Sequence, residues 1–426
     1  MKRTIIPVSD LKGEVLLSGS KYLANRWVVL AALAEQPVTL NNVVNNDDIS
    51  AAVAGLNQLG YHLTRSDTTQ LRSEPRASGL VQDTRVFTHH SGTFSRFVSA
   101  LAALEKVSVT IAGSDKMNTR PMADLFRALR QLGVKISANG NRLPAIIHGP
   151  IKEFNCVIDG SVSSQYISAL LLIAPKLAQD FSLTLTGKAV STQYIDMTLD
   201  LMAKLNVAVT QQGRTYRISA EQNYSGGEFT IAPDPVSSSY FLAAPAIAGG
   251  QVTLQQYDFD SLQGEANFYQ VLKQMGCELT RNGDALTLAR HNASLQAVDV
   301  DMGDMPDVVQ TLAVVACFAE GTTVMRNIAH LAFKESDRIK DTARELQRVG
   351  AQVEFGSDYL AVTGGGSLKG AIIETYDDHR MAMSMALLGT KVDNITINHA
   401  EVVAKSFPDY FDKLASIGIH SQMSQS

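Results

Sequence analysis

The chain is poor in the residues that mark several large classes of protein. Its 426 residues include only three cysteines and one tryptophan, and Cys156, Cys277 and Cys317 are widely spaced in apolar surroundings. This spacing is typical of ordinary buried cysteines and argues against a disulfide framework or a metal site. No apolar run is long enough to cross a bilayer, which argues against a membrane protein.

Charge is scarce as well. Asp, Glu, Lys and Arg make up 19% of the chain, the net charge is −5 and there is no basic tract, which argues against nucleic acid as the main partner. No secretory signal precedes the first apolar segment at Ile5 and Val8, so we expect a cytoplasmic protein. The length is too great for one core and predicts about two or three domains.

What the chain does contain is a short phrase that recurs six times, roughly 70 residues apart. Each copy has two apolar residues three positions apart and then Gly or Asn, which tolerate the left-handed conformation at a helix end. The copies are Leu56–Gly60, Leu129–Gly133, Met202–Asn206, Leu272–Gly276, Leu346–Gly350 and Leu414–Gly418. Alternating residues after four of them predict strands at Val134–Ile136, Val207–Val209, Cys277–Leu279 and Ala351–Val353.

A second phrase, out of step with the first, joins a small-residue helix end to a strand. It occurs at Ala32–Leu40, Ala103–Ile111, Ala246–Leu254, Cys317–Val324 and Met385–Val392, the last followed by Ile395–Ile397. Together the two phrases predict six repeated units, each with two helices and several strands. The glycine-rich segment Gly364–Ser367 is predicted to be a hairpin connection.

Basic and polar residues gather where loops enter the predicted helices. These junctions are 17–26, 91–96, 119–121, 159–165, 191–194, 305–307, 334–338, 376–383 and 404–411. In one of them, Lys334 and Arg338 are predicted to lie one turn apart on one helix face. A single junction is more often a capped helix or a surface ion pair. Because helix N-termini also attract anions, the whole set predicts a protein that binds a small polyanion.

These residues resemble the enolpyruvyl transferases, and within them the 5-enolpyruvylshikimate-3-phosphate synthase family. The resemblance runs from Gly19 to Phe411, and its most specific segments are Asp159–Gln165, Lys334–Arg338, Asp378–Met383 and the motif at Lys405. It implies an α/β (α+β) fold, a two-lobed inside-out αβ barrel with three βαβαββ repeats in each lobe. One lobe would comprise residues 1–20 and about 235–426, and the other about 21–234.

The resemblance also implies a reaction. The enolpyruvyl group of phosphoenolpyruvate would pass to the 5-hydroxyl of shikimate 3-phosphate, with release of phosphate from a tetrahedral ketal, in the pathway to chorismate and the aromatic amino acids. Both substrates are anions, so guanidinium and ammonium groups must line the site. No metal or organic cofactor is expected, nor a nucleic-acid or membrane partner, and the protein is expected to be a monomer.

The resemblance assigns roles to individual residues. Those implied to bind phosphoenolpyruvate are Lys21, Gly92, Arg120, Arg338, Arg380 and Lys405. Those implied to bind shikimate 3-phosphate are Lys21, Tyr22, Arg26, Ser163, Ser164, Gln165, Ser191, Tyr194, Asp307, His330 and Lys334. The proton transfers need a set of carboxylate and ammonium groups, for which Lys21, Asp307 and Glu335 are the candidates.

Several positions bear on the choice of acceptor. The sister enzyme that uses UDP-N-acetylglucosamine has a cysteine in the loop matching 113–119, and this chain has none there, which favours the shikimate branch. Tyr22 replaces a small hydroxyl residue of the family, the pair His89-His90 stands where the family has Gly-Asn, and His330 replaces an asparagine. Two alternatives therefore stay open: a paralogue with another phosphorylated acceptor, and a catalytically weakened paralogue that only binds.

Overall fold

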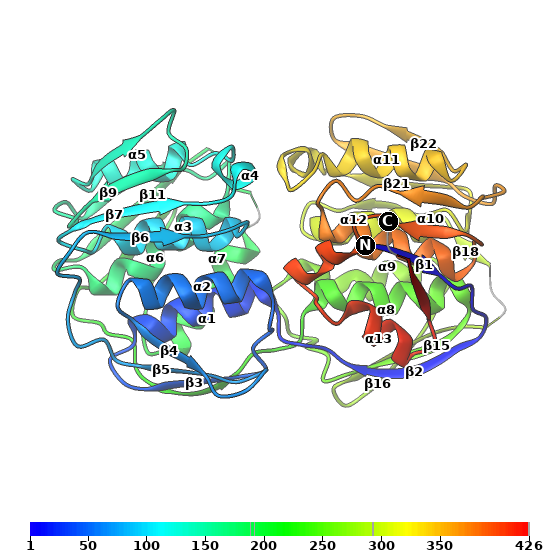
Figure 1. Cartoon of the computed structure of the whole chain (residues 1–426), viewed down its shortest axis with the longest axis horizontal. Helices are drawn as coiled ribbons and strands as arrows, with labels where there is room; N and C mark the ends of the chain where they lie inside the picture. The colour runs from blue at the N-terminus through cyan, green and yellow to red at the C-terminus, as the bar shows by residue number, and fades with distance from the viewer. Residues whose placement is uncertain (188, 191, 292–293, 425–426) are drawn as a thin grey trace. The chain divides into compact units, whose positions relative to one another are not determined.

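The computed structural model describes residues 1–187, 189–190, 192–291 and 294–424, and two compact bodies make up the chain (Figure 1). Unit 1 comprises Met1–Ser18 and Ala232–Ser426, and unit 2 comprises Gly19–Ile231. Unit 2 is thus a continuous segment inserted into unit 1.

Six sheets of one topology build these bodies. Among the described residues, each unit has three four-stranded sheets, and every sheet is a parallel pair extended on one side by two antiparallel strands. One short parallel pair, β18 (Leu295–Gln296) with β20 (Ala319–Glu320), is added in unit 1. The repeated sheets confirm the six predicted repeats.

In unit 2 the sheets have the strand orders β14-β3-β5-β4, β6-β7-β9-β8 and β10-β11-β13-β12. Their bounds are β3 Val38–Asn41, β4 His62–Arg65, β5 Leu71–Glu74, β14 Gly227–Thr230, β6 Thr84–Phe87, β7 Ser108–Ala112, β8 Lys135–Ala138, β9 Ala145–His148, β10 Asn155–Asp159, β11 Phe181–Thr186, β12 Thr210–Gln212 and β13 Thr215–Ile218.

In unit 1 the orders are β16-β17-β15-β2, β19-β21-β23-β22 and β24-β25-β1-β26. Their bounds are β1 Lys2–Ile5, β2 Leu11–Leu16, β15 Gly250–Gln255, β16 Glu278–Asn282, β17 Ala285–Arg290, β19 Asp299–Asp301, β21 Thr322–Arg326, β22 Gln352–Phe355, β23 Tyr359–Thr363, β24 Ala371–Ile373, β25 Ile395–Ile397 and β26 Ser421–Ser424.

Each repeat places one helix in the centre of its unit and one nearer the surface. The central helices are α1 (Lys21–Leu33), α3 (Gly92–Ala102) and α6 (Ser164–Ile173) in unit 2, and α8 (Pro235–Ala248), α10 (Val309–Ala316) and α12 (His379–Ala386) in unit 1. Every residue of α8, α10 and α12 is buried. Small residues such as Ala243 and Ala313 let the backbones of these helices approach closely.

The second helix of each repeat buries only one face. These helices are α2 (Asp47–Gln58), α5 (Ala123–Gln131), α7 (Gln193–Lys204), α9 (Phe268–Gln274), α11 (Arg338–Arg348) and α13 (Tyr410–Ser416). The remaining helical turns are α4 (Asp115–Asn118), η1 (Ala174–Lys176), η2 (Gly264–Asn267), η3 (Pro306–Val308), η4 (Ala329–Phe333), η5 (Leu387–Thr390) and η6 (Ala400–Lys405).

The six predicted helix ends are confirmed, and all six have the same geometry. The turn residues have positive φ, namely Gly60 (81°), Gly133 (81°), Asn206 (62°), Gly276 (102°), Gly350 (94°) and Gly418 (95°). In each case the next residue's N–H donates to the carbonyl of the first apolar residue of the phrase, as Tyr61 does to Leu56 at 3.1 Å. These bonds are the mark of the Schellman motif and satisfy helix carbonyls that would otherwise lack a donor.

Two local predictions are wrong. Val207–Val209 is not a strand, because the Gln222 side chain bonds both the N–H and the carbonyl of Ala208 (2.6 and 2.9 Å) before β12 begins at Thr210. Gly364–Ser367 is not a hairpin connection, because it links β23 to β24, which belong to different sheets.

The three cysteines are free and buried, as predicted. Burial raises the pKa of the thiols of Cys156, Cys277 and Cys317 to about 12. They therefore stay protonated at neutral pH and pack as small apolar side chains. In the part of the chain that the structure describes, no helix is long and apolar enough to cross a membrane.

Candidate active site

Charged side chains from three helix starts, which belong to two repeats, meet in unit 1. Asp307 lies in η3 ahead of the buried helix α10, Arg338 opens α11, and Asp378 caps the buried helix α12, of which Arg380 is the second residue. All four side chains are at most 3% exposed. The repeated architecture therefore converts three sequence-distant helix starts into one buried ionic cluster.

Arg338 is the hub of this cluster. Its Nη1 donates to Asp307 Oδ1 (2.7 Å), its Nε donates to Asp378 Oδ2 (2.7 Å), and its Nη2 donates to Glu335 Oε2 (2.9 Å) and Asp378 Oδ1 (3.2 Å). Four of the five N–H donors of the guanidinium are thus engaged. Burial by itself lowers the pKa of Arg338, but Asp378, Glu335 and Asp307 outweigh burial and raise it, so the side chain is always a cation.

Asp307 is shared by two guanidinium groups. Its Oδ1 accepts from Arg338 and its Oδ2 from Arg380 Nη2 (3.2 Å). The phenol of Tyr240, on α8, lies 3.4 Å from Arg380 Nη1, and the Asp307 N–H donates to Glu265 Oε1 at 3.4 Å. These contacts fix the Asp307 carboxylate in one orientation, which a proton-transfer group requires.

Glu335 lies at the rim of the cluster and is partly exposed. Its Oε1 accepts from Lys405 Nζ at 2.8 Å and its Oε2 from Arg338 Nη2 at 2.9 Å. Lys334 Nζ is 3.9 Å from Asp307 Oδ1. Lys334 precedes α11, so the prediction that it shares a helix face with Arg338 is wrong; both still reach the same carboxylate.

His330 lies in η4 beside the cluster and is partly buried. Burial, and then the charge of Lys334, lower its pKa below the ordinary value of histidine. The imidazole is therefore neutral at pH 7, and it adds no positive charge for an anion.

In unit 2, several of the predicted residues lie at the first turns of the three central helices. Lys21 opens α1, Gly92 opens α3 and Ser164 opens α6, as predicted. Ser163 caps α6 by accepting from the Gln165 N–H (3.3 Å), and the Gln165 side chain donates to Thr93 on α3 (3.2 Å). Ser191, implied to bind shikimate 3-phosphate, lies outside the described residues.

Lys21, Tyr22 and Tyr194 form a compact group. Lys21 Nζ lies 3.7 Å from Asp48 Oδ2 and 5.5 Å from the centre of the Tyr22 ring. The Tyr22 and Tyr194 rings are 5.0 Å apart. The tyrosine at position 22 is thus packed between two other predicted ligands, in contact with both.

Arg26 is fully buried among neutral groups. Its N–H groups donate to Thr198 Oγ1 (2.7 Å), Ser168 Oγ (3.3 Å) and the carbonyls of Tyr22 and Tyr194 (both 2.9 Å). Burial lowers the pKa of Arg26 to about 10, so it stays charged at pH 7. Its contacts hold α1, α6 and α7 together, and Arg26 therefore positions the backbone that carries Tyr22 and Tyr194.

Gly92 and Arg120 are in direct contact. A Cβ at Gly92 would lie 2.4 Å from Arg120 Nη1 and 2.9 Å from Arg96 Nη1. Arg96 donates to the carbonyls of Gly92 (2.8 Å) and Pro121 (3.0 Å). A larger residue at position 92 would therefore have to displace the ends of these two side chains at the start of α3. Arg120 lies three residues ahead of α5 and is partly exposed.

The two adjacent histidines that depart from the family pattern lie at the surface. His89 and His90 are exposed in the turn before α3, His89 with φ 51°. His90 Nδ1 shares a hydrogen bond with Ser114 (2.8 Å), and the His89 ring packs on Phe87. Their side chains thus contact the end of β6 and the loop after β7, where Ser114 caps α4.

Sequence reasoning missed some of the cluster. Asp378 could have been recognised, because an Asp before a helix start is a typical N-cap; its second role as the main partner of Arg338 has no local signal. Glu265 and Tyr240 have no signal at all in their own segments. They reach the cluster because η2 packs against η3 and α8 packs against α12.

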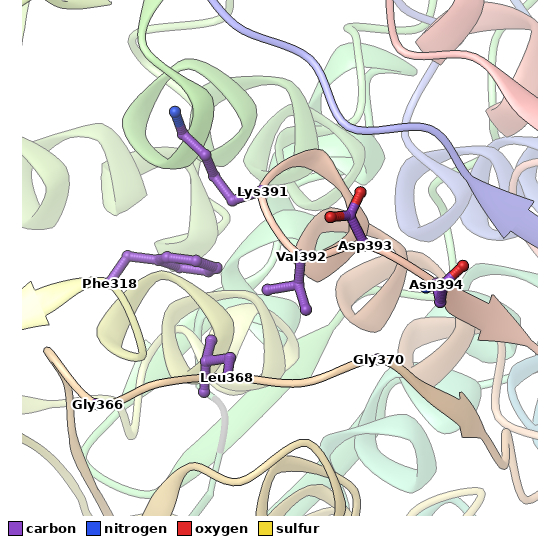
Figure 2. A pocket seen from close by; sticks show the side chains of 8 residues that line it. All are labelled: Phe318, Gly366, Leu368, Gly370, Lys391, Val392, Asp393 and Asn394. Atoms are coloured by element: carbon purple, nitrogen blue, oxygen red, sulfur yellow. The ribbon is translucent and has the colours of Figure 1, made fainter.

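A separate cavity of about 370 Å³ lies in unit 1, away from the cluster. In Figure 2, Phe318, Leu368 and Val392 line it while Lys391 extends outward. None of the predicted site residues borders this open cavity. Across the described ranges, no group of three or more His, Cys, Asp or Glu is arranged to hold a metal ion.

Comparison with known families decides the affiliation. The family model for EPSP synthase (3-phosphoshikimate 1-carboxyvinyltransferase) matches residues 5–414. The chain belongs to the EPSP synthase family. Relatives named 3-phosphoshikimate 1-carboxyvinyltransferase include that of Photobacterium profundum, 40% identical over 424 residues, which are 97% of this chain and 98% of the relative.

The relative of the same name from Shewanella oneidensis is 40% identical over 421 residues, with 97% and 98% coverage. Among solved structures, an EPSP synthase from Acinetobacter baumannii superposes with a TM-score of 0.85 at 23% identity, with 100% of both chains covered. That likeness confirms the fold class predicted for this chain, which is that of the EPSP synthase family. At this identity it shows the fold alone.

Proposed function

We propose that the protein transfers the enolpyruvyl group of phosphoenolpyruvate to the 5-hydroxyl of shikimate 3-phosphate and releases phosphate through a tetrahedral ketal. Its family membership and the shared name of its relatives support this activity. The compartment (cytoplasm), the monomeric state and the lobe boundaries at residues 20 and 235 remain predictions.

The observation that carries the proposal for the site is the position of Glu335. Its carboxylate is held by Arg338 and Lys405, two cations proposed to bind phosphoenolpyruvate. A phosphate or carboxylate of the substrate makes the same charge-assisted bonds. Binding of the substrate would therefore displace Glu335 from its two cations and leave a carboxyl group beside the bound substrate, where a proton must be moved.

Within unit 1 the proposed division of labour follows from burial. Arg338 and Arg380 are buried and fixed by Asp307, so they supply a rigid positive wall for phosphoenolpyruvate. Lys405, Lys334 and Glu335 are partly exposed and can change partners. Asp307 would orient the acceptor and take the proton of its hydroxyl group, and Lys334 and His330 would contact the acceptor. Glu335 would carry out the proton transfer at the methylene carbon of phosphoenolpyruvate.

Within unit 2 the proposed ligands group by helix start. Lys21, Gly92 and Arg120 would bind phosphoenolpyruvate, with Lys21 also acting in proton transfer. Residues of α1, α6 and α7, together with Ser191, would bind shikimate 3-phosphate: Lys21, Tyr22, Arg26, Ser163, Ser164, Gln165 and Tyr194. Because the N–H groups of Arg26 already donate to backbone carbonyls and side-chain hydroxyls, we propose that Arg26 acts mainly by holding Tyr22 and Tyr194 in place.

The test is phosphate release by the purified protein with both substrates. We expect release with shikimate 3-phosphate and none with UDP-N-acetylglucosamine. Lys405→Met should lower the rate strongly, whereas the matched Lys391→Met, at the separate cavity of Figure 2, should leave it unchanged. Release with the nucleotide sugar alone, or with neither acceptor in a folded protein that binds phosphoenolpyruvate, would refute the proposal in favour of the two alternative paralogues.

A further inference from the structure

A buried carboxyl group behind the ionic cluster has no part in the proposed chemistry. Glu265, in η2, is 0% exposed, and its Oε1 accepts from the backbone N–H of Asp307 at 3.4 Å. Gly264, the first residue of η2, packs so closely on the carbonyl oxygen of Asp304 that a Cβ would not fit there. Because Glu265 is fully buried, its carboxyl group is shielded from water beside Asp307.

The elements around Glu265 determine which charges it faces. η2 packs against α8, α9 and η3. The residues of α9 buried beneath it are Phe268, Val271 and Leu272, which are apolar. Glu265 faces the carboxylate of Asp307 from η3, and the charge of Arg380 from α12 also acts on it. The phenol of Tyr240, on α8, contacts Arg380.

The charges of the cluster are balanced only when Glu265 is ionised. Four carboxyl groups (Glu265, Asp307, Glu335 and Asp378) accompany four basic groups (Lys334, Arg338, Arg380 and Lys405). Burial, and then the charge of Asp307, raise the pKa of Glu265 to about 7, although Arg380 opposes the shift. Near neutral pH the group is therefore poised between its two protonation states.

We propose that Glu265 is a positioning residue that takes up a proton when phosphoenolpyruvate binds to the unit 1 cluster, so that its neutral form supports Asp307 and Arg380 without opposing the anion. The inference rests on the proposed function, since it assigns phosphoenolpyruvate to these cations. Glu265 acts through Asp307 and Arg380 and does not touch the substrate itself.

The direction of the effect follows from linkage. A bound anion adds negative charge near Glu265 and raises its pKa further, because a like charge disfavours ionisation. The effect is reciprocal. Ionisation of Glu265 weakens the binding of the anion by the same factor by which the bound anion strengthens the binding of the proton to Glu265. Affinity for phosphoenolpyruvate should therefore fall as the pH rises through about 7. The phosphate of the substrate loses its last proton near pH 6. This titration acts in the opposite sense, because it should strengthen the binding of the substrate as the pH rises.

The experiment measures kcat/KM for phosphoenolpyruvate from pH 6.5 to 9 at saturating shikimate 3-phosphate. For the wild type we expect a decline of up to about tenfold per pH unit above the pKa, the limit for one proton. Glu265→Gln, which keeps an oxygen for the Asp307 N–H but cannot ionise, should remove the decline and stay within about threefold of the wild type at pH 6.5. Glu265→Asp should restore a decline.

A matched control is Glu345→Gln. Glu345 is equally buried in unit 1 and accepts from Tyr376 and the Glu374 N–H, away from the cluster. Its variant should keep the wild-type decline. A wild-type decline in Glu265→Gln would overturn the proposal, and so would a loss of kcat in Glu265→Gln that is equal at every pH. If the wild type itself releases no phosphate, the proposed function fails instead, and the two failures are distinguishable.

Discussion

Replacing Asp378 with Asn tests whether the ionic cluster is held together by charge. The Asp378 carboxylate is 0% exposed and accepts from Arg338 Nε (2.7 Å), Arg338 Nη2 (3.2 Å), Ser336 Oγ (3.0 Å) and the Arg380 N–H (2.9 Å). Asn keeps one acceptor oxygen and remains a good N-cap for α12. What is lost is the negative charge and one oxygen facing a buried guanidinium.

The magnitude follows from the partners that remain. Removing one partner of a buried ion pair costs about 3–5 kcal/mol, and hydrogen bonds to charged groups contribute about 1.5–3 kcal/mol. Arg338 keeps Asp307 and Glu335, so we expect the free energy of unfolding of unit 1 to fall by about 2–3 kcal/mol. In a unit of about 200 residues this lowers Tm by roughly 4–12 °C.

The matched control is Asp337→Asn. Asp337 caps α11 by accepting from the Lys340 N–H (3.1 Å), and it is partly exposed. Because Asn caps as well as Asp, this variant should keep Tm within about 2 °C of the wild type. Thermal unfolding of both variants, with KM for phosphoenolpyruvate measured alongside, gives the comparison. Equal shifts of Tm in the two variants would show that Asp378 is only a cap, and the reasoning about the cluster would be refuted.

Three other substitutions test individual roles. Glu335→Gln should lower kcat by about 10²-fold or more in steady-state kinetics, because it removes a proton-transfer group, while the affinity for the substrates should change little. A near-normal kcat would assign this role to Asp307 or Lys21 instead. Gly92→Ala should raise KM for phosphoenolpyruvate because its Cβ would lie 2.4 Å from Arg120 Nη1, whereas Gly366→Ala, with nothing within 4 Å, should not; equal KM values would contradict this. Tyr22→Ser should weaken the binding of shikimate 3-phosphate, measured by calorimetry, because it removes one proposed ligand and the ring that packs on Tyr194, another proposed ligand; tighter binding would mean that Tyr22 only crowds the site.

The repeats could be predicted because their signal is local. An apolar pair three residues apart followed by Gly or Asn encodes a Schellman motif within six residues, and all six copies form one. Strand partners carry no such signal. β3 pairs with β14, and β1 pairs with β25 and β26, across most of a unit or of the chain. Val207–Val209 alternates like a strand, yet Gln222 captures its backbone.

The site shows the same division. Residue types at helix starts indicated where cations gather, and the structure brings Asp307, Glu335, Arg338, Arg380 and Lys405 together. The sequence could not indicate that these cations are already paired with carboxylates before any substrate arrives. It also could not indicate Glu265, because the approach of η2 to η3 is a matter of tertiary packing.

The insertion of unit 2 into unit 1 has a consequence for how the chain folds as the ribosome makes it. β1 lies between β25 and β26, and β2 pairs with β15. The first strands emerge early but must wait for their partners, whereas unit 2 is continuous and has all of its strands once residue 231 has emerged. During most of synthesis β1 and β2 are therefore unpaired strands, which are open to association with other chains. Unit 2 would fold first, and the last residues of the chain, by pairing with its first, complete unit 1.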